Sequence, residues 1–317
     1  MKAACYSKYG PPEVLYVKEA EKPVLQKNEI LIKIRATAVN SGDCRLRKAD
    51  PFAIRFVFGL TKPKINILGS VFSGEVENVG EQVKRFSIGD QVFGHTDMHF
   101  GAYAEYIAVP ETGSLAIKPE NISHNEAAAI PFGAVTALHF IKKAIIKPGQ
   151  KVLVVGASGA VGSAAVQLAR SFGADVTGVC STANIALVKS IGANKVIDYT
   201  KEDFSQNGEV YDLIFDTVNA VSVTRTLKSL SREGLLVLSA AGMWKMLQGI
   251  WFSSTSKKRV LTGLIRHTSE DIVFLKELIE TDKFKPVVDS IYSLEQIAEA
   301  HAYVEKGHKK GNVVIAI

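Results

Sequence analysis

The sequence predicts an α/β protein in which a doubly wound parallel sheet follows a mostly-β region. Three observations support this prediction. Residues 1–110 contain short apolar segments separated by glycine-containing turns. From residue 151 onwards, apolar segments of strand length alternate with segments of helical length, which is typical of a parallel sheet with helices on both faces. After residue 269 this alternation gives way to two helical segments and a last strand.

The first region is predicted to be all-β with many turns. Its strands are expected at Glu29–Arg35, Val71–Val79, Gln91–Gly94 and Tyr103–Val109, and Gly89-Asp90 forms a turn between two of them. The pattern changes near Ser123, where Ser123 and Glu126 form a capping box before an alanine-rich helix that Pro131 interrupts.

The alternating region begins after a turn at Lys147–Gln150. Strands are expected at 151–155, 175–180, 195–198, 211–216, 235–240 and 259–265, and helices at 160–172, 184–191 and 222–230. Beyond the alternating region, we expect helices at 269–281 and 291–306 and a final strand at 312–317.

The composition is that of a globular enzyme, with 47% hydrophobic and 22% charged residues. Three widely spaced cysteines exclude a disulfide framework and a paired zinc site of the CxxC type. The amino terminus lacks a secretory apolar core, so a cytoplasmic location is expected. The net charge of +6 gathers near residues 45–64 and 257–266, a pattern that suits an anionic cofactor, a membrane surface or, less well, nucleic acid.

A glycine-rich turn, Gly156-Ala-Ser-Gly-Ala-Val-Gly162, stands directly between the strand 151–155 and the following helix. In the dinucleotide-binding pattern, Ala157 would occupy the tight turn, Gly159 would let the backbone approach a pyrophosphate, and Gly162 would let helix and strand pack closely. The free N–H groups and the positive dipole end of that helix attract phosphate. We therefore predict backbone contacts to the pyrophosphate from Ser158, Gly159, Ala160 and Val161.

The second strand of the alternating region predicts which nicotinamide cofactor binds. An NAD site usually has Asp or Glu at the end of this strand, but here it ends in Val179-Cys180-Ser181-Thr182. Small hydroxyl side chains accept a 2′-phosphate without repelling it. With Asn184 nearby and Lys189 further along, the sequence predicts NADPH rather than NADH, with Ser181 and Asn184 facing the 2′-phosphate and Tyr199 near the adenosine ribose or phosphate.

The whole chain resembles the medium-chain dehydrogenase/reductase superfamily, and within it the quinone oxidoreductase and enone reductase branch. The matching segments lie in the family's order from end to end: Ala38–Asp43, Gly89–Gly94, Gly101–Tyr106, Gly133–Leu138, Gly156–Gly162 and Gly307–Asn312.

The resemblance implies a GroES-like mostly-β domain at residues 1–123, completed by residues 267–317. It also implies a Rossmann domain at residues 124–266 inserted between them, with the active site in the interdomain cleft. It further implies a homodimer formed through the last Rossmann strand, here near Val260–Leu264.

The zinc-dependent members of this superfamily carry metal ligands that this sequence lacks. Asn40 stands in place of the ligand cysteine, and Gly69-Ser70-Val71 replaces the segment that holds a histidine. The four-cysteine structural lobe is also missing, and His95 and His99 are interpreted as incidental, so no metal site is predicted. Without zinc to stabilise an alkoxide, reduction of an electron-poor quinone or enone is favoured over alcohol oxidation.

Asn40 and Thr136 are the predicted catalytic residues. Asn40 would contact the nicotinamide or the substrate carbonyl, because an amide both donates and accepts, although it could instead hold a turn. Thr136 resembles the family's threonine beside the nicotinamide carboxamide, with a capping or core hydroxyl as the alternative. Further cofactor contacts are predicted at the ends of the fourth and fifth strands and at the last strand, namely Val218, Ala240, Gly242 and Asn312.

Two apolar segments, Phe52–Phe58 and Met243–Phe252, are interpreted as lids over a bulky substrate or as packing surfaces. The sequence shows no convincing proton donor, which leaves water or His95. We therefore predict an NADPH-dependent quinone or enone reductase that acts without zinc. The alternatives are a zinc-independent alcohol dehydrogenase-like enzyme and a non-catalytic NADPH-binding protein that contacts RNA, a membrane surface or a partner.

Overall fold

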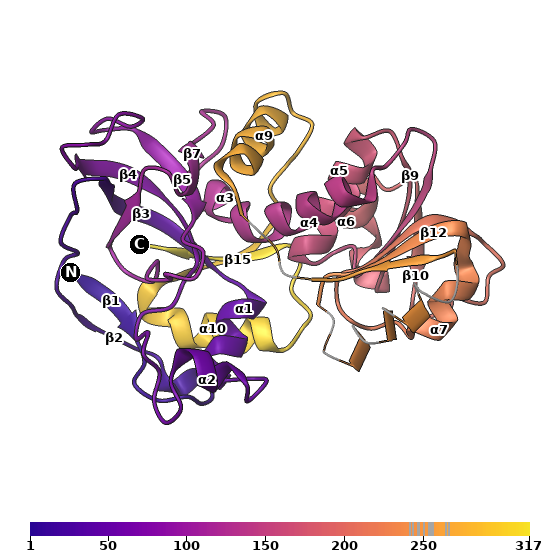
Figure 1. Cartoon of the computed structure of the whole chain (residues 1–317), viewed down its shortest axis with the longest axis horizontal. Coiled ribbons are helices and arrows are strands. Elements are labelled where there is room, and N and C mark those ends of the chain that lie inside the picture. The colour runs from indigo at the N-terminus through magenta and orange to yellow at the C-terminus, as the bar shows by residue number, and fades with distance from the viewer. Residues whose placement is uncertain are drawn as a thin grey trace. The chain divides into compact units, whose positions relative to one another are not determined.

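The computed structural model describes residues 1–317 apart from 241, 243, 246, 247, 250, 253–256, 264 and 266 (Figure 1). The chain folds into two compact units. The mixed-sheet unit comprises Met1–Phe132, His267–Asp282 and Pro286–Ile317, and the parallel-sheet unit comprises Gly133–Arg266 and Lys283–Lys285. The chain therefore leaves the mixed-sheet unit, forms the parallel-sheet unit and returns.

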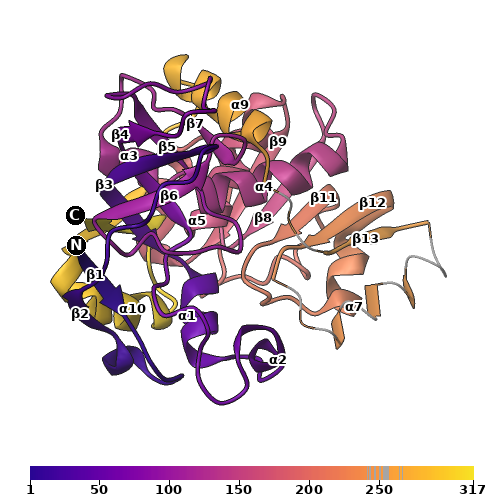
Figure 2. The same cartoon turned by 60° about the vertical axis from the view of Figure 1, so that its left-hand side comes forward.

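The parallel-sheet unit has the doubly wound topology that the sequence predicts. Its six strands lie in the order β10-β9-β8-β11-β12-β13, and every neighbouring pair is parallel. In chain order this arrangement is 3-2-1-4-5-6, the Rossmann order, and Figure 2 shows β11, β12 and β13 side by side. The strands are β8 (Lys151–Val155), β9 (Asp175–Cys180), β10 (Lys195–Asp198), β11 (Tyr211–Asp216), β12 (Leu230–Leu238) and β13 (Arg259–Leu261).

Burial explains the apolar character of these strands. Leu153, Ile214 and Leu236, on three adjacent strands, have fully buried side chains, because helices cover a parallel sheet on both faces. The helical elements are α4 (Pro131–Ala144), α5 (Ala160–Ser171), η2 (Thr182–Asn184), α6 (Ile185–Ser190), α7 (Val223–Thr226) and η3 (Leu227–Ser229).

The mixed-sheet unit is built on a larger, mainly antiparallel sheet. Its path is β14-β15-β3-β4-β5-β7, and β6 pairs with β3. The strands are β3 (Glu29–Val39), β4 (Val71–Val79), β5 (Gln91–His95), β6 (Tyr106–Pro110), β7 (Ser114–Ile117), β14 (Val288–Ser293) and β15 (Asn312–Ala316), and a separate pair joins β1 (Lys2–Cys5) to β2 (Tyr16–Glu19). The structure thus confirms the predicted α/β class, with a sheet of Rossmann strand order inserted into a β-rich unit.

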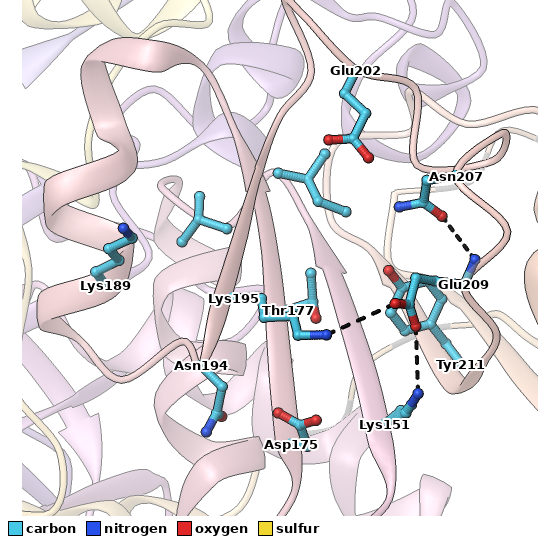
Figure 3. Close-up of a pocket in the computed structure, with 12 residues that line it drawn as sticks. Lys151, Asp175, Thr177, Lys189, Asn194, Lys195, Glu202, Asn207, Glu209 and Tyr211 are labelled. Atoms are coloured by element: carbon cyan, nitrogen blue, oxygen red, sulfur yellow. Dashed lines mark hydrogen bonds and ion pairs between the residues drawn. The ribbon is translucent and has the colours of Figure 1, made fainter.

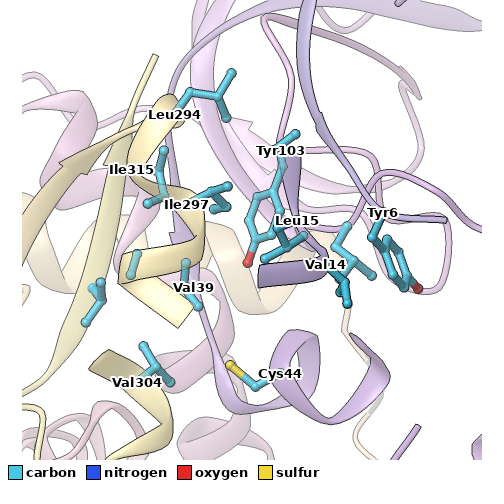
Figure 4. Close-up of a cluster of buried hydrophobic side chains, with 14 of the residues drawn as sticks. Tyr6, Val14, Leu15, Val39, Cys44, Tyr103, Leu294, Ile297, Val304 and Ile315 are labelled. Carbon is cyan, nitrogen blue, oxygen red and sulfur yellow. The ribbon is translucent and has the colours of Figure 1, made fainter. Parts of the chain in front are cut away.

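Short helices surround this sheet, namely η1 (Pro12–Val14), α1 (Ser41–Lys48), α2 (Ile54–Phe58), α3 (His124–Ala128), α9 (Ser269–Glu280), η4 (Leu294–Gln296) and α10 (Ile297–Glu305). Figure 4 shows the apolar cluster between α10 and the sheet, in which Val39 of β3, Ile297 of α10 and Ile315 of β15 are buried together. The cluster joins residues from both ends of the chain, so β15 and α10 complete the core that β3 begins.

The prediction of one helix over 291–306 is wrong at its start. Residues 288–293 form β14, which pairs in parallel with β15, and the helical elements begin only after Ser293. A capping box between Ser293 and Gln296 marks that start. The strand was missed because its partner lies about 20 residues further along the chain, and such a pairing leaves no local pattern.

The parallel-sheet unit begins at Gly133, later than the position 124 given by the resemblance. α3 packs against β3 and β4, so it belongs to the mixed-sheet unit. The capping box at Ser123 and Glu126 and the interruption of the helix at Pro131 are both confirmed. Within the described part of the chain, no helix has the length and apolar character needed to cross a membrane.

Candidate functional site

The glycine-rich turn connects β8 to α5 and leaves the amino end of α5 available to an anion. Gly159 is the N-cap of α5, so the N-cap position has no side chain to accept from the first N–H groups of the helix. A Cβ atom placed on Gly159 would meet its nearest atom only at 3.5 Å, so the backbone is open to close approach. This combination of unpaired N–H groups and open backbone is what a pyrophosphate requires.

Of the three roles predicted within this turn, the close packing at Gly162 is confirmed, the tight turn at Ala157 is misplaced, and the approach of a pyrophosphate to Gly159 stays a prediction. Gly162 packs so closely that an added Cβ would lie 2.0 Å from the carbonyl oxygen of Gly156, so helix and strand meet there as expected. The left-handed turn residue is Gly156, with φ of +78°, whereas Ala157 is a fully buried residue whose N–H bonds the carbonyl of Val179. The prediction that Ala157 makes the tight turn is therefore wrong by one position.

Three predicted cofactor residues come together beside this turn. The side-chain amide of Asn184 donates to Ser158 Oγ at 3.0 Å and to Ser181 Oγ at 3.3 Å. The Oδ1 atom of Asn184 is buried without a partner. This cluster lies at the carboxyl ends of β8 and β9, where ligands bind in open α/β sheets. An orphaned buried acceptor and two hydroxyl groups next to the pyrophosphate turn fit the ribose end of a dinucleotide.

A carboxylate that sequence reasoning missed lies on the neighbouring strand. Asp198 ends β10, and its oxygens accept hydrogen bonds from the Thr182 hydroxyl and from both the hydroxyl and the N–H of Thr200. Hydrogen bonds from the two threonines hold the pKa of Asp198 below its usual value. Tyr199, the predicted adenosine contact, is next in the chain and is exposed. The pairing of β10 with β9 is the signal that would have placed Asp198 here.

The remaining predicted contacts of this unit also follow the carboxyl ends of strands. Val218 is exposed after β11, and its N–H donates to the Asp216 carboxylate at 3.1 Å. Ala240 and Gly242 follow β12, and among the described residues nothing lies within 4 Å of a Cβ placed on Gly242. These positions border the same edge of the sheet as the glycine-rich turn.

A surface hollow of about 440 Å³ lies at the opposite edge of the same sheet (Figure 3). Residues at the amino ends of four strands line it, and its charges are partly paired, since the Lys151 and Lys195 ammonium groups contact the Glu209 carboxylate at 3.4 and 3.8 Å. Lys189 also lines this hollow, so it stands away from the carboxyl edge where the 2′-phosphate was expected. The hollow is separate from the predicted cofactor site.

In the mixed-sheet unit, Asn40 and Ser70 are joined directly. The side-chain amide of Asn40 donates to Ser70 Oγ at 2.9 Å, and both residues are buried. The Oδ1 atom of Asn40 caps α1 by accepting from the N–H groups of Gly42 and Asp43 at 2.8 and 3.0 Å. Asn40 therefore performs the turn-holding role considered as the alternative, and its amide has one further N–H to donate.

Hydrogen bonds from buried polar side chains hold the turn at Asn40 in place. The Oδ2 atom of Asp43 accepts from the Tyr103 hydroxyl at 2.9 Å and from the Asn40 N–H at 3.3 Å. Burial raises the pKa of Asp43 to about 7, and the bonds from Tyr103 and Asn40 oppose this rise only in part. Sequence reasoning missed this network because Asp43 and Tyr103 are 60 positions apart.

Thr136 and Asn312 are both buried, each in its own unit. Thr136 lies on α4 of the parallel-sheet unit, and Asn312 begins β15 of the mixed-sheet unit. Both the N–H and the side-chain amide of Asn312 donate to the carbonyl of Val287, at 2.9 and 3.1 Å. These hydrogen bonds join β15 to the residue before β14. The role of Asn312 toward a cofactor stays a prediction.

His95 belongs to a cluster of polar side chains that the sequence does not reveal. Its ring stacks on that of His267 with centroids 3.8 Å apart, and His267 Nδ1 lies 3.0 Å from the Asp97 carboxylate. Burial lowers the pKa of His95 to about 4, so the ring is uncharged at neutral pH. Thr96, between His95 and Asp97, donates its N–H to the carbonyl of Ser70 at 2.7 Å, which brings the cluster next to the Asn40–Ser70 pair.

The two predicted lid segments carry exposed aromatic side chains. Phe52 and Phe56 pack edge-to-face at the surface of the mixed-sheet unit, and Trp244 and Trp251 are exposed in the parallel-sheet unit. Residues 243, 246, 247 and 250 of the second lid, and Leu264 of the predicted dimer strand, lie outside the described residues.

Comparison with known proteins identifies the family of this arrangement. Residues 26–120 match the model of the alcohol dehydrogenase GroES-like domain, and residues 191–315 match a model described as zinc-binding dehydrogenase. The chain is 34% identical to 2-methylene-furan-3-one reductase of Solanum lycopersicum, over 99% of this chain and 79% of that protein. It is 33% identical to the chloroplastic NADPH-dependent alkenal/one oxidoreductase of Arabidopsis thaliana, over the same shares of the two chains.

A solved structure shows the same fold throughout. The quinone oxidoreductase from Coxiella burnetii superposes with a TM-score of 0.91 at 30% identity, covering 100% of this chain and 99% of that one. The Rossmann strand order, the glycine-rich turn and the β-rich unit that β15 completes are thus all accounted for by one family. The chain belongs to the medium-chain dehydrogenase/reductase superfamily of nicotinamide-dependent oxidoreductases, in the branch of the quinone oxidoreductases and enone reductases.

Proposed function

We propose that the protein reduces quinones or α,β-unsaturated carbonyl compounds with NADPH and without a catalytic zinc ion. The observation that carries this proposal is the hydrogen bond between Asn40 and Ser70. These two residues occupy the segments where zinc-dependent members hold the metal, and an amide paired with a hydroxyl offers no sulfur or imidazole ligand. The names of the relatives, an enone-type reductase and a quinone oxidoreductase, agree with this chemistry.

The parallel-sheet unit supplies the residues that would hold the cofactor. The N–H groups at the start of α5 would bind the pyrophosphate, and the cluster of Ser158, Ser181 and Asn184 would receive the 2′-phosphate of NADPH. The carboxylate of Asp198 is held by Thr182 and Thr200 rather than offered to a ribose hydroxyl. When bound, the nicotinamide ring supplies the hydride.

Asn40 would assist by donating its remaining amide N–H to the carbonyl oxygen of the acceptor. An enone or quinone that gains hydride develops an enolate or phenolate, an anion mild enough for hydrogen bonds to stabilise. The bonds to Ser70, Gly42 and Asp43 fix the amide, so it needs no reorganisation during the reaction. His95 is uncharged at neutral pH and accepts a bond from the Asp97 N–H, so we propose that water protonates the product.

The test is NADPH oxidation followed at 340 nm with a panel of quinones, enals and saturated aldehydes. We expect quinones and enals to accelerate oxidation and saturated aldehydes to be inert. Enzyme treated with EDTA and dialysed should keep its activity, because the proposed chemistry uses no metal at Asn40. Acceptor-independent oxidation, or activity restored only by added zinc, would refute the proposal.

We also propose that two copies of the chain associate through β13. This strand comes last in the order of the six-stranded sheet. A strand at the edge of a sheet can extend that sheet into a second copy. Size-exclusion chromatography with light scattering tests this, and a Val260→Pro variant should shift a dimer to monomer.

A further inference from the structure

Three side chains of the mixed-sheet unit gather their ligand atoms in one place, outside the predicted cofactor and substrate residues. Among the residues that the structure describes, His95, Asp97 and His267 form a group in which one ligand atom from each lies within 4.8 Å of the others. The Asp97 carboxylate oxygen is 3.0 Å from His267 Nδ1 and 3.6 Å from His95 Nδ1. We propose that this group binds a divalent first-row transition metal ion of the zinc type.

The spacing of these atoms suits such an ion. Bonds of about 2.0–2.2 Å from a zinc ion to nitrogen and oxygen place neighbouring ligand atoms about 3.0–3.4 Å apart in tetrahedral or octahedral geometry. The two distances to Asp97 are within a few tenths of an ångström of this range. Two imidazoles and one carboxylate are a common ligand set for zinc and iron(II), and they leave further positions for water.

The protonation state of His95 also fits a ligand. Its Nδ1 atom accepts a hydrogen bond from the Asp97 backbone N–H at 2.8 Å, so this nitrogen carries a lone pair rather than a proton. This lone pair is on the edge of the ring that faces the Asp97 carboxylate. On binding, the Nδ1–metal bond would take the place of the hydrogen bond from the Asp97 N–H. The lone pairs of the two stacked rings lie in nearly parallel planes, which differ by 13°, so the rings would have to rotate apart about their side-chain bonds for both nitrogens to bind one ion.

The surroundings hold the three groups in position. The His95 side chain is 5% exposed and that of His267 16% exposed, so packing keeps both rings beside the Asp97 carboxylate. The Ser114 hydroxyl contacts the second oxygen of Asp97 at 3.4 Å, the kind of outer hydrogen bond that orients a metal-binding carboxylate. Because Asp97 carries one negative charge, the site would leave a net single positive charge on a divalent ion.

The consequence of binding is a cross-link between distant parts of the unit. His95 ends β5, and His267 is the first residue of the chain after its return from the parallel-sheet unit. An ion held by both would fix the segment before α9 onto the loop after β5. Thr96 of that loop donates its N–H to the carbonyl of Ser70, so the ion would also hold the loop against the Asn40–Ser70 pair. The inference does not depend on the proposed reductase activity.

The test measures metal binding by the full-length protein with any affinity tag removed. After incubation with Zn²⁺ and exhaustive dialysis, we expect one bound equivalent by elemental analysis, a raised melting temperature, and with Co²⁺ a visible absorption band typical of nitrogen and oxygen ligands. Asp97→Asn and His267→Gln should each weaken binding at least about tenfold and remove the thermal shift. Both substitutions preserve side-chain volume, which favours a folded protein, and circular dichroism checks this.

His99→Gln is the matched control, because His99 lies in the same loop but outside the group. It should bind metal as the unchanged protein does. Failure of the unchanged protein to retain Zn²⁺ or Co²⁺ would overturn the proposal. The cluster would then be a set of side chains that only bond one another. Retention that Asp97→Asn and His267→Gln do not weaken, or that His99→Gln weakens equally, would overturn it as well.

Discussion

The side-chain amide of Asn40 bridges the start of α1 and the start of β4, because it caps the helix with its oxygen and donates its nitrogen to Ser70 Oγ at 2.9 Å. One side chain thus has both a structural role, which the hydrogen bonds demonstrate, and a proposed role toward the substrate. Substitutions can separate the two, since a residue that caps a helix need not possess an amide N–H.

Asn40→Ala should lower the free energy of unfolding by about 1 kcal/mol, because α1 loses its cap. Asn40→Ser should retain most of that stability, since serine also caps helices well, but it should lower kcat/KM about as much as Asn40→Ala does. Urea denaturation and steady-state kinetics with a quinone provide the two measurements. If Asn40→Ser keeps the full kcat/KM, the residue only holds the turn.

Ser181→Asp should change the cofactor preference. The new carboxylate would repel a 2′-phosphate and could accept a hydrogen bond from a ribose hydroxyl, so kcat/KM with NADPH should fall by about 100-fold while that with NADH is kept or rises. Ser190→Asp adds the same charge at the far end of α6 and serves as the control. Equal losses with both cofactors would show that Ser181 does not contact the 2′-phosphate.

Substitution by alanine should have different effects at two glycines of the glycine-rich turn. Gly162→Ala would force a Cβ to 2.0 Å from the Gly156 carbonyl, so we expect a loss of several kcal/mol or a failure to fold. Gly159→Ala meets no atom closer than 3.5 Å and should cost less than about 1 kcal/mol. Its added methyl should instead raise the dissociation constant of NADPH, measured by fluorescence titration. Unchanged NADPH binding would remove Gly159 from the cofactor site.

The ionisation of Asp43 should make the stability of the mixed-sheet unit fall as the pH rises. Because burial raises its pKa to about 7 in the folded protein, the folded state holds this proton more tightly than the unfolded state, in which the carboxyl group has its ordinary pKa of 3.8. The contribution of Asp43 to stability is therefore present at low pH and is lost as the pH rises from about 4 to about 7.

Asp43→Asn should remove this dependence, because the amide keeps an acceptor for the Tyr103 hydroxyl and never ionises. We expect the stability of the variant relative to the unchanged protein to rise between pH 5 and pH 8, as measured by thermal unfolding across that range. A difference that stays constant with pH would mean that Asp43 ionises normally in the folded protein. Asp203→Asn, at an exposed loop, is the control.

The sequence predicts the parallel-sheet unit better than the mixed-sheet unit, for a physical reason. The strands of a doubly wound sheet are apolar throughout, and each is followed by its own helix, so the pattern is local. β14 has no such pattern, since half-buried residues such as Ser290 and Tyr292 pair with a strand that comes later in the chain. For this reason part of β14 falls within the helix that the sequence predicts at 291–306.

The residues of the candidate site likewise differ in how far the sequence predicts them. The phosphate-binding turn and the Ser181 region were predictable because their residues are contiguous with the strands that present them. The cluster of His95, Asp97 and His267 was not, because its third member is about 170 positions from the first two and no spacing rule links them. The Asp43–Tyr103 bond and the position of Asp198 beside Thr182 likewise depend on strand pairing.

The place of β15 in the mixed sheet has a consequence for synthesis on the ribosome. β15 lies between β14 and β3, and its residues emerge only after the entire parallel-sheet unit has been made. Until then, the edge of β3 that β15 covers, at Ala36–Val39, has exposed backbone groups and no partner. We expect the nascent chain to fold its inserted unit first and to need protection of that edge, by a chaperone or by speed of translation, until the last strand arrives.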